Sequence, residues 1–179
     1  YGPGWGWAGT PAFRGYKAYV TQGGTRVPAF ISLPNKLPSG TKRNELLSVK
    51  DIAPTLLELA GVKRPKSTFR GVQVSTISGS SMLPLLSKSH EAKEAKADQR
   101  VLGFELFGKR SIRQGPWNLV EMYPPQGTGA WQLYDGRTDL AEQNDLAQSQ
   151  PDKLQELIGL WHQYATENAV VIPDWNSGY

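Results

Sequence analysis

The second half of the chain carries the pattern that most restricts the possible folds, because several short apolar strands precede a single amphipathic helix. Segments 101–108 and 109–123 read as consecutive strands, with Gly115-Pro116 as a turn inside the second segment. The sequence WQLYD at 131–135 supplies a further strand. Strands that follow one another through short turns pair with opposite directions. An antiparallel meander is therefore expected.

A helix is expected over 149–166, directly after this meander. Ser149 is its N-cap in this interpretation, and Pro151 falls in the first turn, where a backbone N–H is not needed. Five apolar residues recur at the spacing of one helix face: Leu154, Leu157, Ile158, Trp161 and Ala165. Such a stripe needs an apolar surface to cover it, so the helix is predicted to pack on the meander. The expected architecture of this half is α+β.

The first half of the chain is predicted to contain two strands and a helix. Residues 16–22 alternate aromatic or apolar residues with polar ones, which favours an extended strand. The apolar run 27–34 is bounded by prolines, which favours a buried strand of a parallel or mixed sheet. Residues 48–62 predict a helix that Asp51 caps and that ends at Gly61, where a positive φ is needed.

A domain boundary is expected in a charged segment near the middle of the chain. Residues 63–81 form a turn-rich connection, and a short helix is expected at 82–86. Residues 87–100 alternate in charge sign, which indicates a solvated loop or a frayed helix. The chain is therefore divided into 1–86 and 87–179.

Composition excludes several classes of protein. The 179 residues are 39% hydrophobic and 20% charged, which is typical of a globular chain. The net charge of +4 is scattered, so no basic block predicts nucleic-acid binding. No apolar run approaches the roughly 20 residues of a membrane helix. The opening, rich in Gly, Pro and Trp, resembles a loop of a larger fold, and we expect the chain to begin in mid-protein.

The residues that usually carry catalysis are sparse. The sequence has no cysteine, which excludes disulfides, Cys-zinc sites and a cysteine nucleophile. Its two histidines, His90 and His162, have no metal-ligand cluster at a familiar spacing. There is no Gly-x-Ser-x-Gly, P-loop or dinucleotide-binding motif, and Gly23-Gly24 is too short a signal for a phosphate loop. Taken alone, these residues encode no complete active site.

Lys17 is the residue with two open interpretations. It lies between Tyr16 and Ala18 in an alternating run, where a lysine can simply extend from a strand into solvent. Arg14 and Arg26 lie close to it in sequence, and three cations in a short segment are also typical of an anion site. Ordinary surface charge and an anionic ligand both explain this pattern.

Three segments resemble the sulfatase family, most closely bacterial arylsulfatases. Lys17 and the following QGGTRVP (22–28) are similar to the family's lysine segment, a Lys followed by Glu/Gln-Gly-Gly-x-Arg-x-Pro. SVKDIAPTLLELAGV (48–62) resembles its Asp-x-x-Pro-Thr-Leu-Leu helix. KRSIRQGPWNLVEMY (109–123) and WQLYDGRTDLAEQNDLAQ (131–148) resemble its C-terminal sheet. The segments follow the family's order and span nearly the whole chain.

Three positions depart from the commonest family pattern. Asn118 stands where lysine is common, and Asp139-Leu140 stands where Asp-Pro is common. Gln22 replaces the usual Glu, as it does in close arylsulfatase relatives. The first two positions are not catalytic in the family, so these departures concern local loop shape.

The resemblance implies an alkaline-phosphatase-like fold. Residues 1–86 would form the C-terminal end of the large α/β domain. Residues 87–179 would form the small α+β domain, a four-stranded antiparallel sheet with a packed C-terminal helix. The chain would then be the C-terminal fragment of an arylsulfatase, with the rest of the large domain as its partner and a small-molecule sulfate ester as substrate.

The resemblance also implies the chemistry of the full-length enzyme. In this family a formylglycine attacks sulfur and a divalent cation, usually Ca²⁺, stabilises charge; the residues that form and bind these groups lie upstream of the matched segments. Lys17 is the one matched catalytic-site residue, expected to bind sulfate and to stabilise charge on the leaving group. Arg26 is expected to form a structural ion pair, and the fragment alone is expected to bind no cofactor and to be inactive.

Two alternative functions remain open. A phosphodiesterase or phosphonate monoester hydrolase of the same fold would use the same lysine, because its substrate carries a similar anion. A sulfatase-like module without a nucleophile would bind sulfated ligands without hydrolysing them.

Overall fold

The computed structural model describes residues 2–87 and 99–174. The chain forms two compact units, one from Tyr1–Ala29 with Asp98–Tyr179 and one from Phe30–Ala97. The first unit therefore joins the N-terminal segment to the C-terminal half. The division of the sequence into domains 1–86 and 87–179 stays a prediction.

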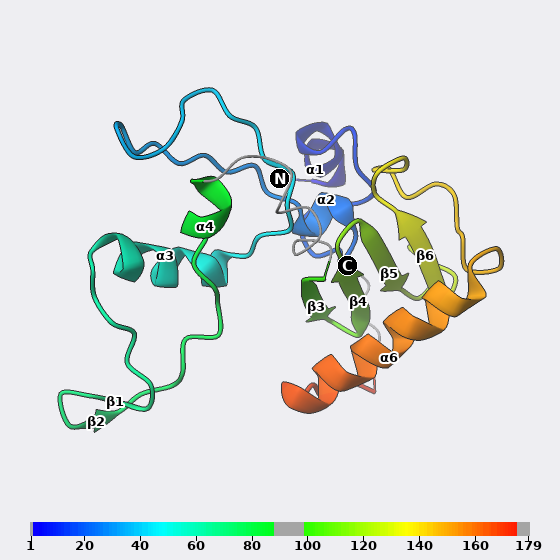
Figure 1. Ribbon diagram of the computed structural model, residues 1–179. Coiled ribbons are helices and arrows are strands. Elements are labelled where there is room, and N and C mark those ends of the chain that lie inside the picture. The colour runs from blue at the N-terminus through cyan, green and yellow to red at the C-terminus, as the bar shows by residue number, and fades with distance from the viewer. Residues whose placement is uncertain (1, 88–98, 175–179) are drawn as a thin grey trace. The chain divides into compact units, whose positions relative to one another are not determined.

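A four-stranded antiparallel sheet forms the centre of the first unit (Figure 1). Its strands follow the chain order: β3 (Val101–Leu106), β4 (Lys109–Gln114), β5 (Trp117–Glu121) and β6 (Trp131–Asp135). The register pairs Ile112 with Leu119, and Leu119 with Leu133. The meander predicted from the sequence is confirmed, including the turn at Gly115-Pro116.

Helix α6 (Pro151–Glu167) packs on one face of this sheet (Figure 1). The buried core between helix and sheet contains Ile112, Leu119, Leu133, Leu157 and Trp161. The predicted stripe is confirmed, because Leu154, Ile158 and Ala165 pack against the same core. The helix begins one residue later than expected: Gln150 occupies the N-cap position, and the Ser149 hydroxyl donates to the Leu146 carbonyl.

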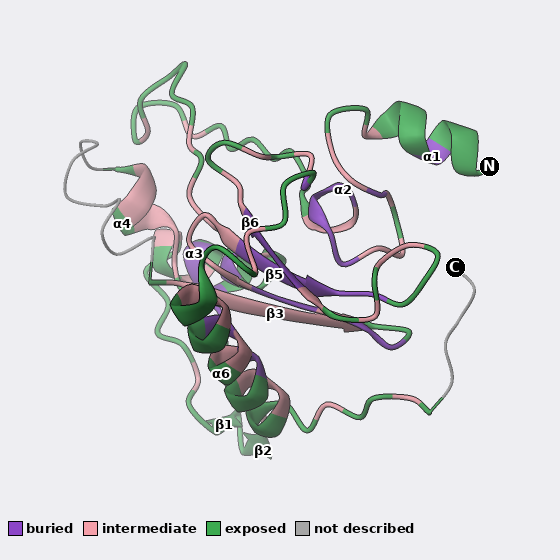
Figure 2. Cartoon of the chain, turned by 90° about the vertical axis from the view of Figure 1, so that its right-hand side faces the viewer, coloured by how far each residue is buried: buried purple, intermediate pink, exposed green. Residues whose placement is uncertain are grey.

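The N-terminal segment packs against a second cluster of buried sheet residues. Val20 is buried together with Val120, Met122 and Tyr134. Around it the segment forms α1 (Pro3–Gly9) and α2 (Gln22–Thr25). Figure 2 shows that buried residues concentrate in the sheet and in α2, whereas most of α1 is exposed.

The second unit contains the helix predicted at 48–62. It begins as a 3-10 turn, η1 (Val49–Asp51), and continues as α3 (Ile52–Leu59). The cap differs from the prediction: Ser48 and not Asp51 is the N-cap of a capping box, in which the Ser48 backbone N–H donates to the Asp51 carboxylate at 2.7 Å. Gly61 follows the helix with a φ of 68°, as its predicted role requires.

The rest of this unit is short and irregular. Helix α4 (Leu83–Leu86) confirms the predicted short helix, and β1 (Thr68–Phe69) pairs with β2 (Val72–Gln73) within the turn-rich connection. The charged linker predicted at 87–100 falls largely on residues outside the described part of the chain, as does His90. Where the chain is described, none of the helices is long and apolar enough to cross a membrane.

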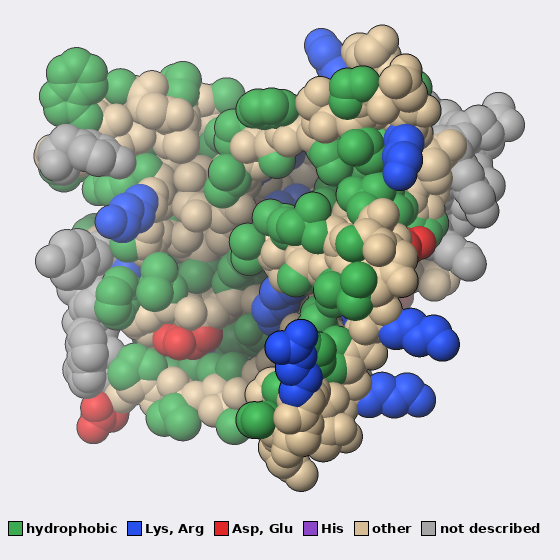
Figure 3. Space-filling model, turned by 90° about the vertical axis from the view of Figure 1, so that its left-hand side faces the viewer, with side chains coloured by type: hydrophobic (Ala, Val, Ile, Leu, Met, Phe, Trp, Pro, Cys, Tyr) green, Lys and Arg blue, Asp and Glu red, His purple; other side chains and the backbone are tan. Residues whose placement is uncertain are grey.

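The buried strand predicted at 27–34 does not form in the structure. This segment has no regular secondary structure, and Phe30 is 97% and Val27 79% exposed. A strand needs a neighbouring strand for its backbone hydrogen bonds, and within the described residues none pairs with this segment. Val27 and Phe30 therefore lie on the surface. Hydrophobic side chains are visible at many places in the space-filling view (Figure 3).

Candidate functional site

Lys17 lies in a tight turn and not on the strand that the sequence predicted. The Tyr19 backbone N–H donates to the Tyr16 carbonyl at 3.0 Å, so the chain reverses within four residues. Ala18 has a φ of 76°, the left-handed value that the third residue of a type II turn requires. The Lys17 side chain is exposed. The predicted strand 16–22 is therefore wrong, because the aromatic residues of the alternating run belong to a turn.

Residues 14–25 form a closed loop around this turn, called here the Lys17 loop. The Gly23 backbone N–H donates to the Arg14 carbonyl at 2.9 Å. The Thr21 hydroxyl donates to the same carbonyl at 2.6 Å. Both ends of the loop are thus fastened to each other within a few residues of Lys17.

Two adjacent glycines permit this closure. A Cβ atom on Gly23 would lie 2.0 Å from the Gly15 carbonyl oxygen, and one on Gly24 would lie 1.9 Å from the Tyr19 carbonyl oxygen. No side chain tolerates contacts this short, so both positions require glycine for close backbone approach. The Gly-Gly pair that was too weak a signal for a phosphate loop has a steric role in the structure.

Aromatic rings surround the turn that carries Lys17. The Trp7 and Tyr16 rings meet edge to face with centroids 5.7 Å apart. The Tyr16 and Tyr19 rings lie 5.0 Å apart. These distances are typical of favourable aromatic pairs. An exposed cation is therefore placed in sequence directly beside an aromatic cluster.

Two contacts from the sheet hold the middle and the start of the Lys17 loop. The Ser111 hydroxyl on β4 donates to the Val20 carbonyl at 3.0 Å. The Arg14 guanidinium donates to the Tyr134 hydroxyl on β6 at 2.9 Å and to the Gln126 carbonyl at 2.8 Å. Burial raises the pKa of Tyr134 to about 12 although Arg14 opposes the shift, so the phenol stays neutral. Arg14 therefore serves as a structural anchor in this structure.

Glu142 holds the far end of the loop. This side chain is only 4% exposed, and its Oε2 accepts the Gln22 backbone N–H at 3.2 Å. The Asn118 side-chain amide on β5 donates to Oε1 of the same carboxylate. Burial raises the pKa of Glu142, while these two hydrogen bonds and the charges of Arg14 and Arg113 act in the opposite direction. Sheet and loop are thus joined through one buried carboxyl group.

Several buried polar atoms around Glu142 have no hydrogen-bond partner. They are both polar atoms of the Gln22 side chain, the Asn118 Oδ1 and the Arg113 Nε. Unpaired buried polar groups cost free energy. This region therefore contributes less to stability than its burial suggests.

The raised pKa of Glu142 leads to a prediction on pH dependence. A folded-state pKa above the usual value means that the native state binds the proton more tightly than the unfolded state. The stability from this group is then fully present below the usual glutamate pKa of about 4.3 and is lost as pH rises through the raised folded value. Replacement by glutamine, Glu142→Gln, removes this dependence because glutamine does not titrate.

Thermal unfolding from about pH 4 to pH 7.5 measures the effect. We expect the melting temperature of Glu142→Gln relative to the wild type to increase across this range. The matched control is the exposed Glu58→Gln, for which the difference should change little. A difference for Glu142→Gln that stays constant or decreases with pH would contradict the prediction.

The remaining predicted residues are not gathered into one centre. The Arg26 guanidinium lies 5.5 Å from the Phe13 ring centroid, so its contact among the described residues is cation–π and not the expected ion pair. His162 is exposed on α6. In the part of the chain that the structure describes, no three His, Asp or Glu side chains come together as a metal site would require.

Glu142 and the anchoring role of Arg14 were not predicted from the sequence. Glu142 lies in a polar turn region and reads as a solvated carboxylate, and its contact with Gln22 spans 120 residues of sequence. The one local signal was Asn118 at a position where lysine is common. Its burial, which only the structure shows, explains why the amide needs a polar partner.

Comparisons with known proteins identify relatives of almost the whole chain. The sequence profile described as N-sulphoglucosamine sulphohydrolase, C-terminal, matches residues 15–165. An uncharacterized sulfatase of Schizosaccharomyces pombe is 38% identical over 96% of this chain and 30% of its own length. The human steryl-sulfatase is 30% identical over 68% of this chain and 18% of its own length. The chain thus spans less than a third of the length of these curated relatives.

Two solved structures share the fold. A Bacteroides thetaiotaomicron protein, from work on glycosaminoglycan metabolism, gives a TM-score of 0.66 at 23% identity, covering 87% of this chain and 32% of its own. Ps i-CgsB in complex with k-i-k-neocarrahexaose also gives 0.66, at 21% identity, covering 91% of this chain and 33% of its own. At these identities the likeness concerns the fold.

Proposed function

Since this chain belongs to the sulfatase family, as a C-terminal portion, we propose that the full-length protein hydrolyses sulfate esters. This chain has the fold of the C-terminal part of an alkaline-phosphatase-like sulfatase, in which a four-stranded antiparallel sheet and a C-terminal helix form the small domain. The observation that carries the proposal is the profile match over residues 15–165, which contains nearly all of the Lys17 loop.

In the proposed reaction Lys17 contacts the sulfate group. A lysine ammonium is a compact charge with three donors, which suits the oxygens of a sulfate ester. The same charge offsets the negative charge that develops on the leaving oxygen, and preplaced charges of this kind are a large term in catalysis. The exposed position of Lys17 and the two-ended closure of its loop support this role.

The proposed substrate class is aryl sulfates. Tyr16 is adjacent to Lys17, and its ring belongs to a cluster with Trp7 and Tyr19. An aromatic leaving group pairs favourably with such rings. The name of one relative, arylsulfatase K of Xenopus laevis, agrees with this class.

Ca²⁺ and formylglycine belong, in this proposal, to the remainder of the full-length protein. They would supply the charge stabilisation and the nucleophile of sulfatase chemistry. The described residues offer no cluster of three acidic or histidine side chains, so they do not fit a metal site of their own. The contribution proposed for this chain is therefore the binding of the sulfate by Lys17.

We propose that the surface segment 27–34 pairs with the rest of the large domain. Val27 and Phe30 are each largely exposed, and apolar side chains of this size are stabilised when a partner buries them. The expected partner of this chain is accordingly the N-terminal part of the sulfatase. The same burial would convert the irregular segment into the strand that its sequence favours.

An assay of the full-length protein tests the proposal. With 4-nitrophenyl sulfate and Ca²⁺ we expect turnover, and with bis(4-nitrophenyl) phosphate we expect much less. The isolated 179-residue chain is expected to be inactive on both compounds, because its sequence lacks the family's Cys/Ser-x-Pro-x-Arg nucleophile motif and its described residues form no metal-binding cluster. Turnover by the purified isolated chain would contradict the assignment of the chemistry to the remainder of the protein.

The same assay decides between the alternatives. Hydrolysis of the phosphodiester in preference to the sulfate would support a phosphodiesterase or a phosphonate monoester hydrolase. Binding of the aryl sulfate by the full-length protein without turnover would support a non-catalytic module.

A further inference from the structure

Glu142, in the turn region after β6, is hydrogen-bonded to the far end of the Lys17 loop. Its carboxylate accepts the backbone N–H of Gln22, the first residue of α2 and five positions after Lys17. We propose that Glu142 is a positioning residue for Lys17: by fixing the first residue of α2, it fixes the place of the lysine. This inference rests on the proposed role of Lys17 in sulfate binding.

The Lys17 loop transmits a displacement of Gln22 because it has little slack. Gly23, the next residue, is hydrogen-bonded to Arg14 at the start of the loop. Gly24 approaches the Tyr19 carbonyl so closely that even a Cβ would not fit. A shift of Gln22 therefore moves the backbone on both sides of the turn that carries Lys17.

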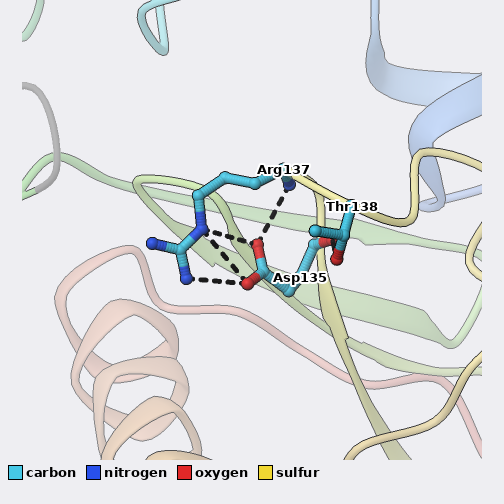
Figure 4. A network of polar contacts seen from close by, with 3 residues as sticks. All are labelled: Asp135, Arg137 and Thr138. Atoms are coloured by element: carbon cyan, nitrogen blue, oxygen red, sulfur yellow. Dashed lines mark hydrogen bonds and ion pairs between the residues drawn. The ribbon is translucent and has the colours of Figure 1, made fainter.

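The segment that presents Glu142 is itself fixed. Directly after β6, the Arg137 guanidinium donates from Nε to Asp135 Oδ1 and from Nη2 to Oδ2, and its backbone N–H donates to Oδ1 at 3.0 Å (Figure 4). The Asp139 carboxylate then accepts the backbone N–H groups of Gln143 and Asn144 at 2.9 and 2.8 Å. These contacts hold both neighbouring stretches, so Glu142 projects from a defined turn.

The backbone of Glu142 adopts an uncommon conformation. Its φ of 54° is a left-handed value that non-glycine residues rarely take. Such conformations persist where the surrounding structure requires them, and they are frequent near functional sites. Here the conformation belongs to the residue whose carboxyl group is buried against Gln22 and Asn118.

Stability alone does not account for this arrangement. A buried carboxyl group with unpaired polar neighbours, among them Asn118 Oδ1 and the Gln22 amide, is a poor source of folding free energy. A buried hydrogen bond with defined geometry is in contrast an effective way of fixing two segments relative to each other. The contacts of Glu142 therefore fit positioning better than packing.

A double-mutant cycle in the full-length protein separates the two roles. We expect Glu142→Ala to lower kcat/KM for 4-nitrophenyl sulfate by about tenfold, similar to Lys17→Ala. If Glu142 acts through Lys17, the double variant should be no worse than Lys17→Ala alone, because coupled residues are not additive. Glu142→Gln should keep most of the activity. The glutamine Oε1 can still accept the Gln22 backbone N–H, and a flip of the Asn118 side-chain amide turns its unpaired Oδ1 toward the glutamine NH₂ group.

The matched control is Leu157→Ala, in the core on the other face of the sheet. Leu157→Ala should lower the melting temperature. Because Leu157 does not act through Lys17, the factors by which Leu157→Ala and Lys17→Ala change kcat/KM should multiply in the double variant. If Glu142→Ala yields no folded protein, Glu142→Leu takes its place in the cycle, because leucine fills a similar volume without a hydrogen-bond acceptor.

Each outcome decides one point. Wild-type kcat/KM in folded Lys17→Ala overturns the role proposed for Lys17, and the positioning role with it. A reduced value for Lys17→Ala together with wild-type activity in the Glu142 variants overturns the positioning role only. Effects that multiply in the double variant, as in the Leu157 control, also overturn it.

Discussion

Replacing Lys17 with alanine in the full-length protein is expected to lower kcat/KM for sulfate esters by at least about tenfold, which corresponds to roughly 1.4 kcal/mol of transition-state stabilisation. The loss should be largest for substrates with poor leaving groups, because these develop the most charge on the departing oxygen. Lys17→Arg should rescue poorly, since a planar guanidinium does not reproduce a point charge.

The fold should tolerate this replacement. Lys17 is exposed at the tip of a turn whose hydrogen bond joins the backbones of Tyr16 and Tyr19. Melting temperature and circular dichroism of Lys17→Ala should therefore match the wild type. Lys66→Ala, which removes another exposed lysine, is the control and should leave kcat/KM unchanged. A folded Lys17→Ala with wild-type kcat/KM would show that Lys17 is only a surface lysine.

The sheet and its helix were predictable because their signals are local. Each strand of the meander has its partner a few residues away, and the stripe through Leu157 and Trp161 has the helical period. The helix at 49–59 was predictable for the same reason: its cap and its terminal glycine lie within the segment itself.

The Lys17 turn was not predictable because its sequence fits two conformations. The alternation of Tyr16, Ala18 and Val20 is that of a strand. In the structure, Ala18 takes a left-handed φ and the rings of Tyr16 and Tyr19 pack on each other. A non-glycine residue at positive φ has no sequence signal, so tertiary contacts decide between the two conformations.

The candidate site was only partly predictable. The family resemblance identified Lys17, but the contacts that hold its loop come from Ser111, Tyr134 and Glu142, each about 90 to 120 residues away in sequence. A single polar residue in a turn gives no indication of such a distant partner. The prediction of a strand at 27–34 was wrong for a different reason. Its sequence favours a strand, but none of the described residues pairs with this segment.

Replacing Trp161 with alanine is expected to have the largest effect on stability. Its side chain is 1% exposed and packs with Ile112, Leu119 and Leu133 of the sheet. Its ring also lies 5.9 Å from that of Trp131. Truncation of a large buried aromatic residue leaves a cavity that the sheet cannot fill, which costs about 3–5 kcal/mol.

Denaturant unfolding followed by circular dichroism measures this loss. Trp161→Phe should lose less, because it keeps most of the apolar volume and leaves a smaller cavity. The exposed neighbour His162→Ala changes the same helix without touching the core, so its stability should stay within about 0.5 kcal/mol of the wild type. If Trp161→Ala were as stable as His162→Ala, the stripe would not hold the helix to the sheet. The loops at their ends would then have to hold the helix to the sheet. The burial of Leu157 at the same interface argues against this, because it shows that apolar packing joins the two elements.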